Sequence, residues 1–184
     1  MDNGASSYLR FLNGDDDGLT DLIRDYKDGL ILYLNGILKD ISLSEEVMQE
    51  TFVKLVIKKP TFRNDSKFKT WLYTIARNEA FDYIRRNSKT ISLMHEDIDF
   101  SEEEEDILTS YIREETNIIL HNALYKLKDD YRQVLYLSYF ENFKNEEISK
   151  IMKIPKRKVE NLLYRAKSSL KAILEKEGFI YENM

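Results

Sequence analysis

Residues 62–87 read FRNDSKFKTWLYTIARNEAFDYIRRN, and this stretch decides how the rest of the chain is interpreted. It opens with the polar run Arg63–Ser66, whose side chains can bond to their own backbone and so favour a turn. Apolar residues then recur at spacings of three and four, which predicts a long helix with one buried stripe. The stripe consists of Phe68, Leu72, Ile75, Ala76, Ala80 and Tyr83.

The other face of this predicted helix carries cations, aromatic rings and an amide, namely Lys69, Tyr73, Arg77, Asn78, Phe81, Arg85 and Arg86. Cations follow phosphates, and flat rings stack on unpaired bases for about 1–3 kcal/mol each. Such a surface suits single-stranded or partly melted DNA. An ordinary amphipathic helix with a wet cationic face would show the same pattern, so the residues alone leave both interpretations open.

The composition favours an all-α protein. The chain has 184 residues, of which 42% are hydrophobic, and only two prolines and six glycines interrupt it. Period-two alternation, the signal of strands, is nearly missing. Cysteine is absent, so no disulfide or thiolate metal site can form, and no cofactor, metal site or catalytic residue is expected.

Charge is unevenly distributed along the chain. The net charge of −5 argues against a generic nucleic-acid binder, which is usually basic overall. Acidic residues, however, concentrate at Asp15–Asp17 and Glu96–Asp106, whereas basic residues concentrate at Arg85–Lys89 and Lys156–Lys158. Such a polarised molecule can present a cationic patch to DNA and an anionic face to a protein.

The N-terminus does not resemble a signal peptide, because it lacks both a basic start and a long apolar run. No uncharged apolar segment is long enough to span a bilayer. These features predict a soluble, cytoplasmic protein without membrane insertion.

A helix is also predicted from residue 44, with Ser44 as its N-cap and Lys58-Lys59-Pro60 as its end. Its inward side is formed by Val47, Met48, Thr51, Phe52 and Leu55, and its opposite face by Glu46, Gln49, Glu50 and Lys54. A solvated face and a docking face are both compatible with this pattern.

The C-terminal part predicts a helix-turn-helix. A short helix over 145–152 and a tight connection precede a long basic helix over 156–174. The outward face of the long helix carries Lys156, Arg157, Lys158, Asn161, Tyr164 and Arg165. Such a helix can enter the major groove, although a plain helical hairpin would share these features. Asn142 is expected in a left-handed turn conformation.

These segments together resemble the sigma-70 family of bacterial RNA polymerase sigma factors, in particular its extracytoplasmic-function branch. The promoter-melting segment of that family resembles Phe62-Arg63, Ser66, Phe68–Tyr73, Ile75–Asn78 and Asp82–Arg86 of this chain. The similarity covers most of the chain and is stronger in the first half.

The resemblance implies two small helical domains, 1–92 and 118–184, joined by a flexible acidic linker, 93–117, with a short helix expected near 107–112. The first would bind core polymerase, then recognise and melt the minus-ten element. The loop at 61–67 would hold a flipped-out base. The implied DNA contacts are Arg63, Asn64, Asp65, Ser66, Lys67, Trp71, Arg77, Asn78, Phe81, Arg85 and Arg86.

The second domain would read the minus-thirty-five element through Lys156–Arg165. This sequence departs from the family there, because Arg157 and Lys158 replace small residues while Glu160 and Leu162 replace basic ones. Each lost phosphate contact weakens affinity for DNA.

The implied partners are promoter DNA and core RNA polymerase. Glu46, Gln49 and Glu50 would meet the coiled coil of the largest subunit, and the C-terminal domain would meet the second-largest subunit. An anti-sigma factor or a DNA-targeting partner protein is a further candidate.

Three alternatives stay open at this point: a stand-alone helix-turn-helix regulator, a sigma-like factor that a partner brings to DNA, and a helical adaptor that binds only protein.

Overall fold

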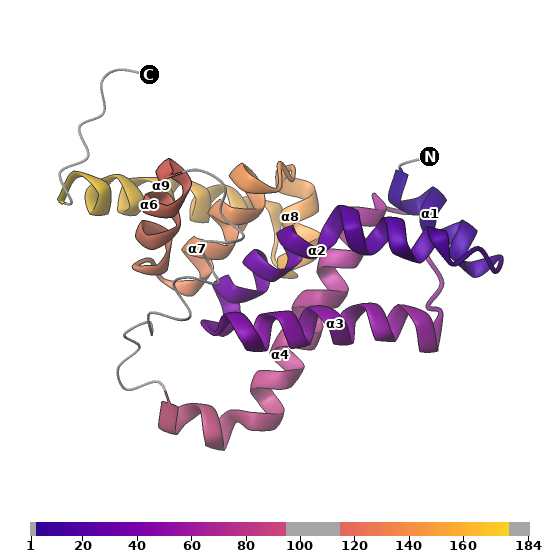
Figure 1. The fold of residues 1–184 in the computed structure, drawn as a ribbon. Helices are drawn as coiled ribbons and strands as arrows, with labels where there is room; N and C mark the ends of the chain where they lie inside the picture. Colours follow the sequence, from indigo (N-terminus) through magenta and orange to yellow (C-terminus); the bar gives the residue numbers. More distant parts are fainter. Residues whose placement is uncertain (1–2, 95–114, 177–184) are drawn as a thin grey trace.

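The computed structural model describes residues 3–94 and 115–176, and every regular element in these ranges is a helix. Figure 1 shows two groups of helices that lie against each other. The N-terminal half contains α1 (Asn3–Leu12), α2 (Asp17–Leu38), α3 (Ile41–Lys58) and α4 (Phe68–Met94). The C-terminal half contains α6 (Glu115–Tyr125), α7 (Asp129–Leu135), the π-helix η1 (Tyr136–Phe140), α8 (Asn145–Met152) and α9 (Lys156–Lys176). The expected all-α fold is confirmed.

The predicted stripe of α4 forms part of the N-terminal core. Phe68, Leu72, Ala76 and Ala80 are fully buried there, whereas Ile75 and Tyr83 are half-buried. The helix packs on both α2 and α3. It continues to Met94, further than the weakening stripe after Lys89 predicts. The acidic run at 96–106 and the helix expected near 107–112 lie outside the described residues.

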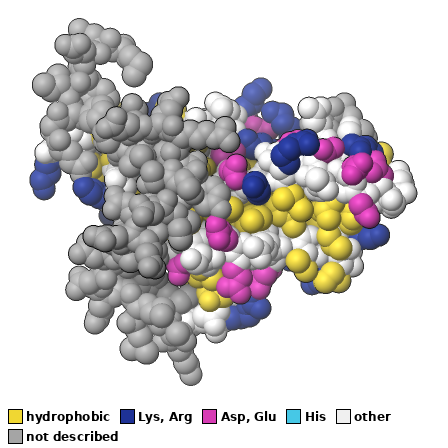
Figure 2. All heavy atoms as spheres, viewed as in Figure 1, with side chains coloured by type: hydrophobic (Ala, Val, Ile, Leu, Met, Phe, Trp, Pro, Cys, Tyr) yellow, Lys and Arg dark blue, Asp and Glu magenta, His cyan; other side chains and the backbone are white. Residues whose placement is uncertain are grey.

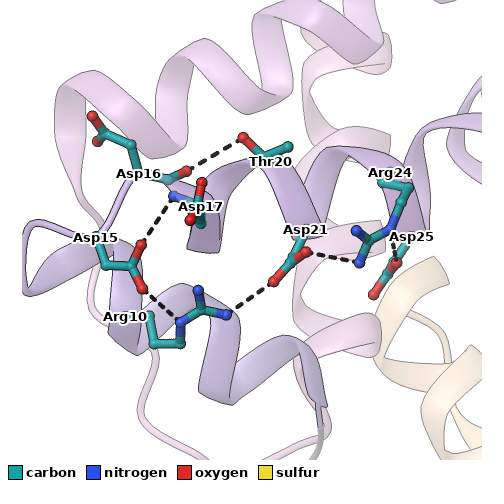
Figure 3. A network of polar contacts seen from close by, with 8 residues as sticks. All are labelled: Arg10, Asp15, Asp16, Asp17, Thr20, Asp21, Arg24 and Asp25. Carbon is teal, nitrogen blue, oxygen red and sulfur yellow. Dashed lines mark hydrogen bonds and ion pairs between the residues drawn. The ribbon is translucent and has the colours of Figure 1, made fainter.

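The start of α2 shows the structural role of the first acidic run. Gly14 has a φ of 93°, which only glycine adopts freely, and it separates α1 from α2. Figure 3 shows Arg10 of α1 between two carboxylates, with its Nε 2.7 Å from Asp15 Oδ2 and its NH1 2.9 Å from Asp21 Oδ2. Arg10 thereby lowers the pKa of Asp21. The acidic run therefore ties the first two helices together.

The N-cap predicted for α3 is wrong. The helix begins at Ile41, and Asp40 caps it by accepting a hydrogen bond of 2.8 Å from the Leu43 backbone N–H. Ser44 is buried, and its hydroxyl donates to the Asp40 carbonyl at 2.6 Å. Asp and Ser are both favoured caps, and the chain enters the helix one turn earlier than Ser44 suggests. The end at Lys58-Lys59-Pro60 is confirmed.

The two halves are packed directly against each other. Helix α8 lies on α4, and α7 lies on α2. Arg132 of α7 is 2% exposed and donates to two backbone carbonyls, of Gly36 at 2.7 Å and of Tyr125 at 2.9 Å. It also pairs with Asp129. The buried apolar side chains of both halves form one continuous cluster.

His121 of α6 is buried against aromatic rings, with ring centroids 4.8 Å from Phe140 and 5.9 Å from Tyr136. Burial lowers the pKa of His121 to about 4, so the folded chain keeps the ring neutral where the unfolded chain protonates it. Protonation of the unfolded chain therefore begins to lower the free energy of unfolding as the pH falls through about 6.5 towards 4. Between pH 7 and pH 5 this loss amounts to about 2 kcal/mol.

We expect His121→Phe to remove that part of the pH dependence, because phenylalanine keeps the ring but cannot be protonated. Urea unfolding at pH 7 and pH 5 measures the difference between variant and parent. An equal loss of stability in both proteins would contradict the prediction.

Candidate nucleic-acid interface

The loop between α3 and α4 exposes most of its predicted DNA contacts. Arg63, Asn64, Asp65 and Lys67 are exposed and Ser66 is half-buried. Asn64 has a φ of 58°, a left-handed conformation that asparagine tolerates. The loop begins at Pro60, whose carbonyl accepts a hydrogen bond of 2.9 Å from the Tyr8 hydroxyl. A buried anchor in α1 therefore fixes one end of an otherwise exposed loop.

Trp71 is a packing residue in this structure. Its ring lies 5.3 Å from Phe68, 5.4 Å from Tyr8 and 5.4 Å from Phe62, measured between ring centroids. Because the side chain is only half-buried, one part of the ring still faces solvent next to the loop. Trp71 therefore packs beside the start of the loop through Phe62 and keeps part of its side chain accessible.

Three of the predicted contacts in the second half of α4, Phe81, Arg85 and Arg86, are exposed. Arg85 pairs with Asp82 at 3.0 Å. Arg77 stacks over the Phe81 ring at 4.3 Å from its centroid, and Phe81 is 38% exposed. Cations and an accessible ring therefore lie along one helix, as a surface for unpaired DNA requires.

The prediction that Tyr73 lies on the exposed face is wrong. Tyr73 is fully buried between the Tyr33 ring of α2 and the Phe143 ring of the C-terminal half, at centroid distances of 5.5 Å and 5.1 Å. Lys69 is half-buried and pairs with Glu141 at 2.7 Å. Arg77 donates to Gln133 at 3.3 Å, and Asn78 is half-buried. The C-terminal half thus covers the first turns of the predicted DNA face.

Helix α9, the predicted recognition helix, presents its predicted contacts to solvent. The exposed residues are Lys156, Arg157, Lys158, Asn161, Tyr164 and Arg165. Tyr164 is 77% exposed. The opposite side is held by the buried Val159 and Ala166 and by Leu163 and Leu170, which are half-buried. The turn before the helix places Lys153 at a φ of 55°, the conformation for which glycine is usual.

The first residue of α9 is electrostatically tied to α8. Lys156 pairs with Glu146, which raises the pKa of Lys156 and lowers the pKa of Glu146. Both side chains are more than half exposed, so the pair is weak and can exchange for a phosphate contact.

Helix α3 exposes the predicted polymerase-binding residues Glu46, Gln49 and Glu50 on one face. Lys54, one turn after Glu50, is half-buried and pairs with Glu79 of α4, so it lies at the edge of this face.

The same face continues with three exposed apolar side chains that the sequence interpretation missed, Val53, Val56 and Ile57. These three residues are spaced at i, i+3 and i+4. Continuing the spacing of Glu46, Gln49 and Glu50 along the helix would have found them. Figure 2 shows apolar side chains gathered over α2 and α3 on the visible face.

Comparison with known families identifies both halves. The family description "Sigma-70 region 2" matches residues 22–90, and "Sigma-70, region 4" matches residues 117–170. The RNA polymerase sigma factor YlaC of Bacillus subtilis is 32% identical over 168 residues, which cover 87% of this chain and 94% of the relative. This chain belongs to the extracytoplasmic-function branch of the sigma-70 family.

Other relatives agree with this assignment. The ECF RNA polymerase sigma factor SigM of Bacillus subtilis is 29% identical over 84% of this chain and 94% of its own length. A co-crystal structure of the sigma factor RpoE with the anti-sigma factor NepR from Bartonella quintana shares the fold, with a TM-score of 0.68 and 20% identity over 87% of this chain and 98% of the other. A structure of CnrH with the cytosolic domain of CnrY matches with a TM-score of 0.68 and 19% identity over 95% and 99% of the two chains.

As a sigma factor, the protein binds core RNA polymerase and directs it to promoters. No helix in the described ranges 3–94 and 115–176 has the length and apolar character to span a membrane. Among those same residues, no three His, Asp or Glu side chains are grouped so that they could hold a metal ion.

We expect Trp71→Ala to lower the free energy of unfolding by about 2–3 kcal/mol, because it removes the ring that packs against three others. Urea unfolding followed by circular dichroism is the suitable measurement, since this is the only tryptophan of the chain. Tyr164→Ala is the control and should change stability by less than about 0.5 kcal/mol. A Trp71→Ala variant as stable as the parent would show that the ring does not support the loop.

Proposed function

We propose that this sigma factor uses three separate surfaces for its task. The exposed face of α3 docks core polymerase, the 61–67 loop with α4 melts the minus-ten element, and α9 reads the minus-thirty-five element. The observation that carries the proposal is the exposure of the polar sides of two helices. On α3 these are Glu46, Gln49 and Glu50, and on α9 they are the six predicted recognition residues.

The polymerase-docking surface consists of Glu46, Gln49, Glu50, Val53, Val56 and Ile57. Its first half is polar and its second half is apolar, so a partner helix can gain hydrogen bonds at one end and burial at the other. Ile57 is 74% exposed, and none of the described residues forms an ion pair with Glu46 or Glu50. Exposed apolar side chains beside unpaired charges are typical of an interface that a partner covers.

Melting is assigned to the loop and α4. The loop residues Arg63–Lys67 would receive a flipped base, Trp71 and Phe81 would offer ring faces, and Arg77, Asn78, Arg85 and Arg86 would contact the displaced strand. Extruding a base costs a few kcal/mol of stacking and pairing, and cation and stacking contacts offset that cost.

Recognition of the upstream element is assigned to α9. Lys156, Arg157 and Lys158 at its start would contact phosphates, and Asn161 and Arg165 would reach base edges. The C-terminal half would also contact the second-largest polymerase subunit.

We assign residues 1–92 and 118–184 to the two domains and 93–117 to the linker. The protein would act in the cytoplasm as a non-enzymatic initiation factor, and an anti-sigma factor is a candidate regulator.

Glu50→Lys should weaken binding to core polymerase by about tenfold or more, because it places a cation in the centre of the docking surface. Titration of labelled sigma factor with core enzyme measures the affinity. Glu175→Lys, the same charge reversal at an exposed site on α9, should bind like the parent. An unaltered affinity of Glu50→Lys would count against this docking surface.

Arg85→Ala combined with Arg86→Ala should abolish most run-off transcription while binding to core polymerase persists, since both side chains are exposed and their contacts among the described residues are local, to Asp82 of the same helix. Run-off transcription with core enzyme first maps start sites for the parent. Permanganate reactivity of promoter thymines then reports melting.

The matched control is Lys171→Ala with Lys176→Ala, which removes two exposed cations elsewhere on the molecule. If the arginine variant opens the promoter like the parent, this part of α4 does not melt DNA.

A further inference from the structure

Helix α1 meets the start of the loop between α3 and α4. The match to sigma-70 region 2 begins at residue 22, so the whole of α1 precedes it. Tyr8 and Phe11 lie one turn apart and therefore share one side of α1. Both are buried: Tyr8 bonds to Pro60, and the Phe11 ring lies 5.4 Å from Lys59 Nζ. Helix α1 thus contacts the two residues with which the chain leaves α3.

Two glycines let α1 pack closely on the rest of the N-terminal half. A Cβ at Gly4 would lie 2.5 Å from Phe68 Cδ1 of α4. A Cβ at Gly18 of α2 would lie 2.3 Å from the Ser7 carbonyl oxygen. Approaches this close require glycine, so the helix that carries Tyr8 is packed tightly on both α2 and α4.

The Tyr8 hydroxyl is a fixed hydrogen-bond donor. Tyr8 is 1% exposed, and its ring centroid lies 5.5 Å from that of Phe68 and 5.4 Å from that of Trp71. Burial raises the pKa of Tyr8 to about 12, so the phenol keeps its proton at neutral pH. The hydroxyl donates to the Pro60 carbonyl oxygen at 2.9 Å.

The loop does not fix its own shape by backbone bonding. Among the described residues, no backbone–backbone hydrogen bond involves residues 60–66. Pro60 also lacks an N–H group, so its carbonyl oxygen is the backbone group through which it can be held. The shape of the loop therefore depends on contacts from other elements.

These contacts act at different points along the loop. Phe62 is held through its ring, which lies 5.4 Å from Trp71 between centroids. Lys150 of α8 donates to the Asp65 carbonyl at 2.9 Å, near the far end of the loop. The hydrogen bond from Tyr8 thus holds the backbone at the point where the loop begins.

We propose that Tyr8 is a positioning residue for promoter opening: its hydroxyl holds the Pro60 carbonyl and keeps the loop at 61–67 in the shape that receives an unpaired base. This inference rests on the proposed role of the loop in melting. Tyr8 is buried, so it acts through the loop rather than by contacting DNA. A loop that already has the receiving shape need not be ordered when the base arrives, which favours binding.

Tyr8→Phe tests this role, because it removes the hydroxyl oxygen and keeps the ring that packs against Phe68 and Trp71. Pro60 is half-buried, so its carbonyl can bond to water in the variant. Tyr131→Phe is the matched control, because it removes the same oxygen from a half-buried tyrosine of α7. Both variants should bind core polymerase like the parent, since neither changes α3.

The measurement uses holoenzyme and the non-template strand of a promoter whose start site has been mapped by run-off transcription. Fluorescence anisotropy gives the affinity for a labelled oligonucleotide that carries the minus-ten element. A series of oligonucleotides with one abasic site each, placed at successive positions of the element, shows where an unpaired base contributes to binding. Comparing parent and variant on intact and abasic strands isolates the coupling between Tyr8 and a single base.

We expect the abasic site at one position to weaken binding by the parent and the control about tenfold, because the stacking of that base is lost. Tyr8→Phe should bind the intact strand about fivefold more weakly than the parent, which corresponds to a loop that has the receiving shape about one-fifth of the time. On the strand that is abasic at this position, Tyr8→Phe should bind like the parent, since the loop has no base to receive.

Tyr8→Phe with the parent's affinity for the intact strand would overturn the inference. An equal loss on the intact strand and on every abasic strand would also overturn it, because the hydroxyl would then act on the protein as a whole, and so would a control that loses as much as the variant. If no abasic site weakens binding by the parent, the loop does not receive a base, and the role of Tyr8 falls with that of the loop. Failure of the proposed function is therefore seen in the parent, and failure of this inference alone is seen in the variant.

Discussion

Helix α4 buries one side in the core of the N-terminal half and leaves part of its other side, with Phe81, Arg85 and Arg86, exposed. Much of the molecule is arranged around this division. The buried side pairs large residues with alanines, Phe68 and Leu72 with Ala76 and Ala80, so α2 and α3 can approach closely. The loop before it is held by Tyr8 and Trp71 on one side, and on the other by Glu147 and Lys150 of α8, which contact Lys67 and the Asp65 carbonyl. The exposed residues of the loop are therefore supported by packed aromatic side chains.

The proposed docking surface on α3 and the proposed melting surface on α4 lie on helices that pack against each other. The Lys54–Glu79 pair joins α3 to α4, and the proposed docking residue Glu50 lies one turn before Lys54 on α3. Under the proposed assignment, a partner bound to α3 would be positioned relative to α4 through the packing of these two helices.

Most of the fold could be predicted from the sequence because helix periodicity and end signals are local. The bounds of α8 and the start of α9 are as predicted, and Asn142 adopts the expected left-handed conformation. Local signals failed where two residues compete for one role, as Asp40 and Ser44 do at the start of α3. They also failed for Tyr73, because the rings that bury it, Tyr33 of α2 and Phe143 of the other half, are distant in sequence.

On the candidate functional surfaces, too, features set by local spacing were predictable and features set by distant contacts were not. Exposure of Glu46, Gln49 and Glu50 follows from amphipathic spacing and was predictable. The apolar continuation at Val53, Val56 and Ile57 was missed because apolar residues in a helix are first assigned to the core. No pattern within α4 alone indicates that Lys69 is already paired, since its partner is contributed by a turn whose placement depends on the packing of both halves.

The continuous buried cluster also determines how the protein loses its structure. Because Arg132 and the rings around Tyr73 belong to both halves at once, heating should melt them in a single cooperative transition rather than in two steps. Each half expressed alone would expose apolar surface that its neighbour normally covers, and such fragments tend to aggregate. A fragment that contains only one half would therefore need polar substitutions on the surface that the other half covers.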